Sequence, residues 1–561
     1  GGVTSLYGTG NTDATFHKDP NVVTDANGNV VENGKDVQYT NVRSVLTGAN
    51  ANNYTVADTV YGKGTIRKRT VSVNDFNFNI SNATKEYDGT KDVEYVEGGK
   101  TYKDLPHLKK RFQTSTLDLG GGNTAPINLD DITLTGAKYN DERVAHATGI
   151  NYDVTINAQN FEFNGGRDKR IEHTGDTITK RDLATKLPPH LIKEYDREDS
   201  FTETNTVFAN AMARANLTGV VDSDKNKIRL AVNGHYDSPD ASTETREEAE
   251  ARTPAQAGRN VHYDLTLSGD TDTLSNYKIG TVETLDSDGK MRGVGSGKAD
   301  IYKKTLTVDV ERKVKDYDGT AAVNNLAKND VTFQGMVNNE SLQMDDDSIK
   351  KVKGQYLDSA GKPDENVRRD ANRNVLDKAV EYTGLNDALN DLATRNNTAK
   401  NYRVEGGSRR YTADDGKGRI DPLKFHDPSN DVKMTFAATG PSKIYDRETT
   451  VKYKGLGTDK ALKNYLTDAT VMVGGKARSI KDELEIDPTR THYDNKNAGT
   501  GKTVTYGFAY KGNNFEIADF TKESDVKGEI KRKDVKVLPV DQLWKTYDSE
   551  RDVYVEGDDS I

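Results

Sequence analysis

Short stretches in which apolar and polar residues alternate recur along the whole chain. They are rich in β-branched and aromatic residues, as in "RTVSV" at 69–73, "KTLTVDV" at 304–310 and "TVTYGFAY" at 503–510. Alternation at a period of two is typical of strands that bury one face. The pattern therefore predicts a chain that is mainly β.

Helical spacing of apolar residues is confined to a few short stretches. These are "NTVFANAMARANL" at 205–217, "LNDALNDLA" at 385–393 and "DKALKNYL" at 459–466. In each, the apolar residues fall on one face of a helix. We expect one short helix per repeat unit, with a loop inserted between strands as the alternative at the same places.

A phrase that contains Tyr-Asp occurs five times, and in each copy a Lys stands two residues before the Tyr. Its spacing of more than a hundred residues is that of a domain rather than of a solenoid repeat. We assign these residues as a structural repeat motif: Tyr87, Asp88, Gly89, Tyr195, Asp196, Tyr317, Asp318, Gly319, Tyr445, Asp446, Tyr547 and Asp548.

Two further sequence markers recur along the chain with about the same spacing as this phrase. The first is an Asn-aromatic pair, found at Asn53-Tyr54, Asn160-Phe161, Asn276-Tyr277, Asn401-Tyr402 and Asn514-Phe515. The second is an isoleucine followed by a new strand, found at Ile66, Ile178, Ile301, Ile420 and Ile530. Three markers in a fixed order define one repeat unit.

The markers divide the chain into repeats with boundaries just after each isoleucine. We predict the C-terminal part of a unit at 1–67, complete units at 68–179, 180–302, 303–421 and 422–532, and the start of a further unit at 533–561. Both ends are therefore expected to be cut from a longer polypeptide. No Gly/Ser-rich or Pro-rich linker separates the units, so we expect a stiff, elongated rod in which four units span about 150 Å.

Composition favours many small domains over one large core. Apolar residues make up 33% of the 561 residues, below the usual share, yet 27 Tyr and 14 Phe argue against a disordered chain. We therefore expect a tandem array of four small β-rich domains, β-grasp-like or Ig-like, each with a thin core. The net charge of −10 is spread along the chain, so no basic stripe is available for nucleic acid. The absence of Cys excludes disulfide bonds.

The Tyr-Asp phrase has the chemistry of a turn. Asp accepts a hydrogen bond from the main chain two residues on, Gly adopts a positive φ, and Tyr buries its ring while its hydroxyl finds a partner. A catalytic Tyr-Asp pair would need a base or acceptor that recurs in every unit, and none does. We therefore predict a structural role and no enzyme activity.

The last complete unit carries a resemblance to a known repeat family. The phrase at Tyr445, the run "YDNKNAGTGKTVTYGFAYKGNNFEI" at 493–517 and the closing "GEIKRKDVKV" at 528–537 resemble the YDG repeat of large bacterial surface proteins, notably filamentous-haemagglutinin-like adhesins of the two-partner secretion type. Other units depart from it in the turn segments at 140–149 and 364–375.

The resemblance implies a location and a role. It implies export through an outer-membrane transporter partner, an extracellular place at the bacterial cell surface, and use as a stalk or display arm in attachment to surfaces, host or neighbouring cells. Neighbouring repeats of the same chain are then the first partners. It implies no ligand, because one repeat type serves proteins with different partners.

Two alternatives remain open. The repeats themselves could bind a host receptor, another protein or a glycan, or associate laterally with another copy, through edge strands or insertions. The polar, acid-rich insertion at 238–258 is read as a surface loop. A hydrolase with two carboxylates in a cleft is the other alternative, and no unit carries a distinctive constellation for it.

Three acidic segments carry the alternating oxygen ligands of a calcium loop. They lie at 25–29, 222–226 and 286–290, and none has a Glu at the twelfth position. We interpret them as solvated hairpin turns, with a Ca²⁺ site as the alternative. No other cofactor is expected.

Overall fold

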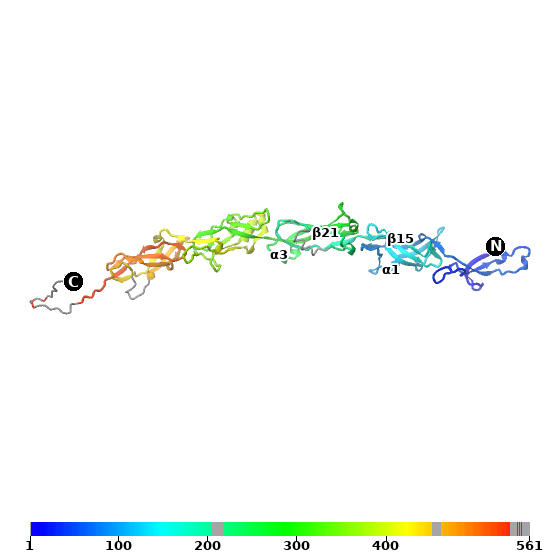
Figure 1. Ribbon diagram of the computed structural model, residues 1–561, viewed down its shortest axis with the longest axis horizontal. Helices are drawn as coiled ribbons and strands as arrows, with labels where there is room; N and C mark the ends of the chain where they lie inside the picture. The colour runs from blue at the N-terminus through cyan, green and yellow to red at the C-terminus, as the bar shows by residue number, and fades with distance from the viewer. Residues whose placement is uncertain are drawn as a thin grey trace. The chain divides into compact units, whose positions relative to one another are not determined.

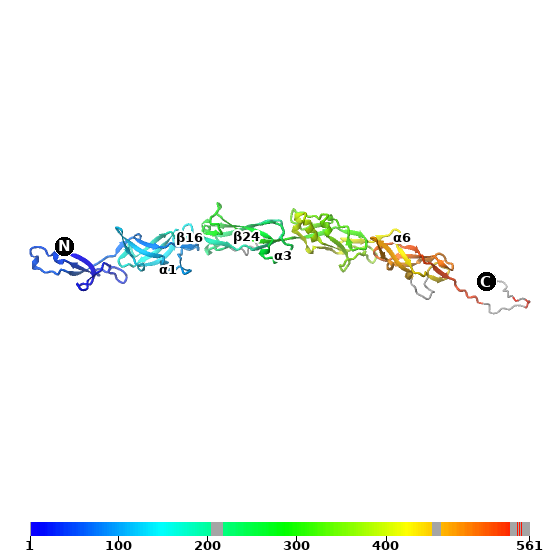
Figure 2. The same ribbon diagram turned by 180° about the vertical axis from the view of Figure 1, so that it is seen from behind.

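The computed structural model describes residues 2–202, 217–451 and 462–538, together with Tyr547, Ser549 and Arg551. The chain divides into two compact units, Gly1–Tyr302 and Lys303–Ile561, and each is treated by itself below. Strands dominate both units and the α-helices are short (Figures 1 and 2). The prediction of a mainly β chain built from small β-rich sheets is confirmed.

Residues 2–67 form one antiparallel sheet with the strand order β2-β1-β3-β4. Its strands are β1 Thr4–Thr9, β2 His17–Lys18, β3 Lys35–Thr40 and β4 Val60–Gly64.

Residues 68–179 contain several small sheets and one α-helix, drawn in blue and cyan in Figure 1. The elements are β5 Arg69–Val71, β6 Phe76–Ile80, β7 Thr84–Glu86, β8 Tyr95–Glu97, β9 Lys100–Tyr102, α1 Leu105–Lys109, β10 Phe112–Gly120, β11 Asn123–Pro126, β12 Ile132–Tyr139, β13 Gly149–Ile156, β14 Phe161–Phe163, β15 Asp168–Thr174 and β16 Thr177–Thr179.

Residues 180–302 are organised around a five-stranded sheet with the order β18-β24-β22-β21-β19. The elements are β17 Arg181–Thr185, β18 His190–Glu194, β19 Ser200–Phe201, β20 Leu217–Thr218, β21 Ile228–Tyr236, α3 Arg246–Ala251, β22 Arg259–Gly269, α4 Thr271–Leu274, β23 Tyr277–Ile279 and β24 Met291–Tyr302.

The second unit contains two further repeats that are built from small β-sheets and short helices. Its first part has β25 Lys304–Val310, β26 Lys313–Asp316, β27 Ala322–Val323, β28 Val331–Gln334, β29 Lys353–Leu357, β30 Ala379–Thr383, α5 Leu385–Ala393, β31 Tyr402–Val404, β32 Arg409–Tyr411 and β33 Gly418–Asp421. Its second part has β34 Leu423–Lys424, α6 Pro428–Asp431, β35 Lys433–Phe436, β36 Ser442–Ile444, β37 Leu466–Val473, β38 Lys476–Ser479, β39 Leu484–Tyr493, β40 Gly499–Lys502, β41 Val504–Tyr510, β42 Phe515–Glu516, β43 Phe520–Glu523 and β44 Gly528–Lys531.

Two parallel strand pairs recur and join the sequence markers to one another. The strand that leads into the Tyr-Asp phrase always pairs with the isoleucine strand, and the phrase Lys always faces the Ile: Lys85↔Ile178, Lys193↔Ile301, Lys315↔Ile420 and Lys443↔Ile530. The first strand always pairs with the Asn-aromatic strand: Arg69↔Phe161, Arg181↔Tyr277, Lys304↔Tyr402 and Leu423↔Phe515.

Between these pairs lie antiparallel sheets whose inner faces are rich in tyrosine. The sheets β12-β13-β15 and β39-β41-β43 are examples. Most of the largest fully buried side chains are tyrosines: Tyr139, Tyr152, Tyr263, Tyr277, Tyr317, Tyr356, Tyr382, Tyr402, Tyr493 and Tyr506. Aromatic rings bury large areas per residue, which explains how a chain of low apolar content builds several cores.

The helix predictions have mixed outcomes. The stretch 385–393 is the helix α5, and it buries the apolar face formed by Leu385, Ala388, Leu389 and Leu392. In 459–466 the described residues form a 3₁₀ turn at Leu462–Tyr465 before β37, because strand pairing takes over at Leu466. Almost all of 205–217 lies outside the described residues. The short helices α1, α3, α4 and α6 were not predicted.

The insertion at 238–258 lies mostly at the surface, as expected, but it is not a loop throughout. This insertion contains α3, which begins at the N-cap Thr245 and fully buries Ala249. Main-chain bonds from Ser242 and Thr243 to the carbonyl of Ile301 tie it to β24. The sequence did not indicate this helix or its bonds to β24, because N-capping and main-chain hydrogen bonds produce no periodic pattern of apolar residues.

We predict that Leu389→Ala destabilises the residues 303–421 by about 2–5 kcal/mol, because it leaves a cavity under α5. The exposed neighbour Asp387 on the same helix gives the control Asp387→Ala, which we expect to change stability by less than about 1 kcal/mol. Differential scanning calorimetry of the full chain measures both. Equal effects of the two substitutions would contradict the burial of α5.

Candidate functional site

In the four complete repeats, the lysine that opens the Tyr-Asp phrase is buried inside its own repeat. Its Nζ donates to the Asp three residues on and to the main-chain carbonyl five residues on, at 2.5–2.8 Å. It also lies over a tyrosine ring of the same repeat, at 4.7–5.7 Å from the ring centre. The four lysines are Lys85, Lys193, Lys315 and Lys443. A buried ammonium group needs such partners to offset its desolvation.

The Asp of the phrase closes the predicted turn. In all four complete repeats its Oδ1 accepts a hydrogen bond from the main-chain N–H two residues on, at 2.9–3.0 Å. The residue after Asp has a positive φ of 70–76°, and it is Gly89, Arg197, Gly319 or Arg447. Arginine therefore adopts the left-handed conformation where the Asp and Lys contacts hold the turn.

Two of these carboxylates have perturbed acidity. Burial raises the pKa of Asp88 and of Asp318, but hydrogen bonds from the phrase Lys and from Thr90 or Thr320 outweigh burial. The net pKa of each carboxyl group therefore lies below its ordinary value. The charged form stabilises the folded turn.

In the two junctions that lie within a single unit, the tyrosine of the phrase packs against the following repeat. Within the first unit, the hydroxyls of Tyr87 and Tyr277 both donate to Oδ2 of Asp224, at 2.9 and 2.8 Å. The two rings pack edge to face at 5.3 Å, and all three residues are buried. Tyr277 belongs to the Asn-aromatic marker of the next repeat, so two sequence markers more than a hundred residues apart meet here.

This cluster keeps both phenols neutral. Burial, followed by the hydrogen bond to Asp224, raises the pKa of Tyr87 well above its ordinary value. Burial is also the largest cause of the raised pKa of Tyr277. The pair therefore serves as a double hydrogen-bond donor, not as a base, at any physiological pH.

The second unit contains the same junction with different polar chemistry. Tyr317 packs edge to face against Phe515 at 5.3 Å, and both rings are almost fully buried. The Arg478 guanidinium lies 5.0 Å from the centre of the Tyr317 ring. No hydrogen-bond partner of the Tyr317 hydroxyl is found among the described residues. Both junctions thus contain the edge-to-face aromatic contact. The carboxylate acceptor of Tyr87 has no counterpart at Tyr317 among the described residues.

Three asparagines of the Asn-aromatic pairs, each within a single unit, bond the preceding repeat. Asn514 accepts from the main-chain N–H of Val367 at 2.8 Å and donates to Asn366 at 2.9 Å. Asn160 makes the same two bonds, with Val22 and Asn21, both at 2.8 Å. Asn276 accepts from the N–H of Val144 at 2.8 Å. We call these contacts the asparagine lock.

The predicted motif residues therefore differ in their surroundings. Tyr87, Tyr195 and Tyr317 are buried, Tyr445 is half-buried and Tyr547 is exposed. Asp88, Asp196, Asp318 and Asp446 each bond the phrase Lys, and Gly89 and Gly319 have the expected positive φ. Asp548 lies outside the described residues.

The acidic segments act as turns in two of three cases. Asp25 and Asp286 each accept main-chain N–H groups two and four residues on within hairpin turns. Asp224, which the sequence placed in a solvated turn, is instead buried beneath the two tyrosines. The described residues contain no group of three or more His, Asp or Glu side chains arranged to hold a metal ion. A role for Ca²⁺ stays a prediction that nothing here tests.

Sequence reasoning identified the markers but missed their contacts. The Lys of the phrase was visible in every copy, and its constant position three residues before Asp was the available signal. The lock residues offered a signal as well, because Val22, Val144 and Val367 each stand three residues after an Asp. Asp224 has no counterpart in the other junction, so repetition could not reveal it.

Comparisons with known proteins give no family. No family model matches the chain, and no curated protein matches it. Among solved structures, protocadherin gammaB7 EC3-6 is 6% identical, with 81% of this chain and 99% of that chain covered and a TM-score of 0.19. Drosophila N-cadherin EC1-4 is 8% identical, with 81% and 99% covered and a TM-score of 0.17.

A match to a surface layer protein is equally distant. Domains 4–9 of the surface layer protein SbsC are 10% identical, with 95% of this chain and 78% of that chain covered and a TM-score of 0.18. Scores of this size do not establish a shared fold, so the function rests on the junction residues. In the described part of the chain, no helix has the length and apolar character needed to span a membrane.

We predict that Asp318→Asn lowers stability at about pH 6 by about 2–3 kcal/mol, the usual value of hydrogen bonds to a charged group. A carboxyl group with a lowered folded-state pKa contributes stability above its unfolded pKa, and this stability is lost as pH falls through the folded pKa. The variant should therefore lose less stability than the natural chain between about pH 6 and about pH 3.

Calorimetry at the two pH values tests this expectation. Asp316→Asn is the matched control, because Asp316 is exposed at the end of β26, two residues before Asp318. A pH dependence that is identical in the natural chain and in Asp318→Asn would contradict the assigned role of the carboxylate.

Proposed function

We propose that this chain is a structural stalk and display region of a large secreted bacterial adhesin of the filamentous-haemagglutinin-like type. In this proposal it lies outside the cell, at the bacterial surface, and holds a binding region away from it. It thereby mediates attachment to surfaces, host or neighbouring cells. The observation that carries the proposal is the asparagine lock, which joins successive repeats at three places.

A stalk needs junctions that resist bending, and the lock supports this. Asn276 and Asn514 are almost fully buried, so separating the repeats would expose or unpair their amide groups. Connections between repeats are short as well. A single residue, Lys180, separates β16 from β17, and a single proline, Pro422, separates β33 from β34. Proline narrows the available φ further.

The remaining parts of the proposal come from the resemblance to YDG repeats. Export would use an outer-membrane transporter, and the ligand of the adhesin would lie elsewhere or on unit-specific surfaces. We propose no catalytic role, because the recurring Tyr-Asp groups are engaged in turns and junctions.

We predict a maximum dimension of about 150 Å or more for the fragment in small-angle X-ray scattering, as four compact domains in a row require. A compact particle of about 80–90 Å would contradict the stalk. The double variant Asn276→Ala, Asn514→Ala should show greater flexibility in the same measurement. Asn513→Ala is the control, because Asn513 is the exposed neighbour of Asn514.

A further inference from the structure

Two histidines lie next to each other on the five-stranded sheet of residues 180–302. His235 in β21 and His262 in β22 are directly opposite partners in the antiparallel register. Their rings are stacked, with 5.0 Å between the ring centres and 21° between the ring planes. Side chains that stand directly opposite each other on one face of a sheet are close enough to interact. The strand register therefore holds two imidazole groups together.

The pair lies on the solvent-facing side of this sheet. Along both strands the residues immediately before and after the histidine are buried, whereas the two histidines are exposed. The next positions in the same row across the sheet are Ser200 in β19 and Ser296 in β24, and both are exposed. Because serine side chains are short, they leave both imidazole rings open to solvent.

The ring nitrogens of this pair are available as ligands. His107, His173 and His190 each use a ring nitrogen to bond an aspartate. Among the described residues, no hydrogen bond or ion pair engages a ring nitrogen of His235 or His262. A neutral imidazole keeps one nitrogen with a free lone pair, and histidine is the commonest metal ligand in proteins. Two such lone pairs are thus present in one small exposed patch.

The type of ligand selects the kind of ion. Imidazole nitrogen suits Zn²⁺, Ni²⁺ and Cu²⁺, whereas Ca²⁺ and Mg²⁺ prefer oxygen ligands. Two imidazoles fill two coordination positions, and water can fill the others. Asp264 is exposed on the same face, two residues after His262, and its negative charge favours a cation there.

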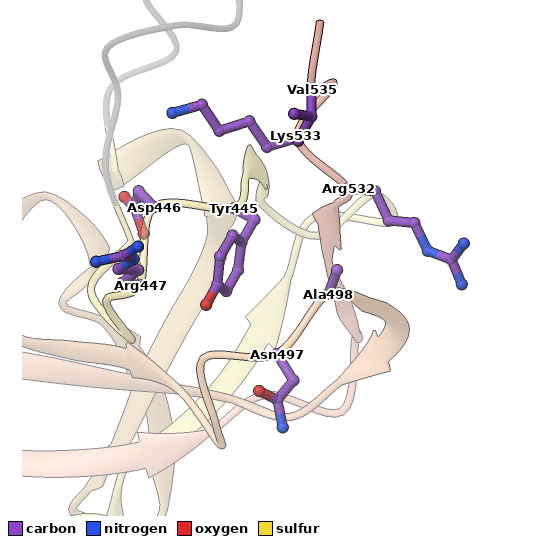
Figure 3. Close-up of a pocket in the computed structure, with 8 residues that line it drawn as sticks. All are labelled: Tyr445, Asp446, Arg447, Asn497, Ala498, Arg532, Lys533 and Val535. Atoms are coloured by element: carbon purple, nitrogen blue, oxygen red, sulfur yellow. The ribbon is translucent and has the colours of Figure 1, made fainter. Parts of the chain in front are cut away.

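The cavity beside Tyr445 in the second unit offers no comparable ligands. It has a volume of about 690 Å³, and Figure 3 shows the side chains on its wall. The described residues that line it include Arg447, Arg532 and Lys533 and no histidine. Three basic groups disfavour a cation by charge repulsion. An ion that prefers imidazole is therefore directed to the sheet and not to this cavity.

We propose that His235 and His262 bind one divalent transition-metal ion of the Zn²⁺, Ni²⁺ and Cu²⁺ class, through one ring nitrogen each, with water in the remaining positions. The ion joins β21 to β22 on the outer face of the sheet. It also presents open coordination positions to solvent, where a side chain of another molecule can replace water. The inference goes beyond the proposed stalk function and does not depend on it, because the site lies wholly within one repeat.

Isothermal titration calorimetry of the full chain with Ni²⁺ tests the proposal. We expect the tightest site to hold one ion per chain. His235→Ala and His262→Ala should each weaken this binding by about tenfold or more, since each removes one of two protein ligands. Excess Mg²⁺ should not displace the ion. His426→Ala is the matched control, because His426 is exposed in the other unit, and it should bind like the natural chain.

Electron paramagnetic resonance of bound Cu²⁺ identifies the ligands themselves. We expect coupling to two imidazole nitrogens in the natural chain and in His426→Ala, and to one in His235→Ala. The three substituted histidines are exposed, so all variants should unfold at the same temperature as the natural chain when a chelator is present. This comparison separates loss of the ligand from loss of the fold.

Two results would overturn the proposal. One is Ni²⁺ binding that is absent, or equally strong in the natural chain, His235→Ala and His262→Ala, as scattered single histidines would give. The other is a Cu²⁺ spectrum of the natural chain that shows coupling to a single imidazole nitrogen.

Discussion

A buried asparagine amide that bonds the main chain of the preceding repeat is the interaction on which the other junction contacts depend. Asn514 both accepts from Val367 and donates to Asn366, so its amide is satisfied only when the two repeats are together. An unpaired buried amide costs about 1–3 kcal/mol. The lock therefore sets the position of the neighbouring aromatic residue, and the ring contact with the phrase tyrosine follows from it.

Residues of the Tyr-Asp phrase make contacts both within their own repeat and with the next repeat. Its Lys and Asp act within one repeat, where a buried ion pair and main-chain bonds hold the turn. Tyr87 and Tyr317 act between repeats, each against the Asn-aromatic pair of the next one. Because one short turn carries both sets of contacts, the conformation of the turn and the contact with the next repeat are coupled. This coupling explains why one chain uses the same phrase repeatedly.

The sequence was sufficient for the local features and insufficient for the distant ones. Strand alternation, the helix at 385–393, the Asp-capped turn and the positive φ after Asp all depend on neighbours within a few residues. The contact of Tyr87 with Tyr277 joins residues nearly two hundred positions apart, and no periodicity encodes it. Asp224 and Arg478 show that the same tyrosine position accepts different partners in different junctions. The structure of the acid-rich insertion could not be predicted, because main-chain hydrogen bonds attach it to the neighbouring strand.

Hydrogen exchange at the amide of Val367 tests the asparagine lock most directly. At single-amide resolution, the account predicts strong protection of this amide in the natural chain and in Asn513→Ala, and loss of protection in Asn514→Ala. The amide of Tyr356, which bonds within its own repeat, should keep its protection in all three chains. Unchanged exchange at Val367 in Asn514→Ala would contradict the claim that the asparagine joins the two repeats.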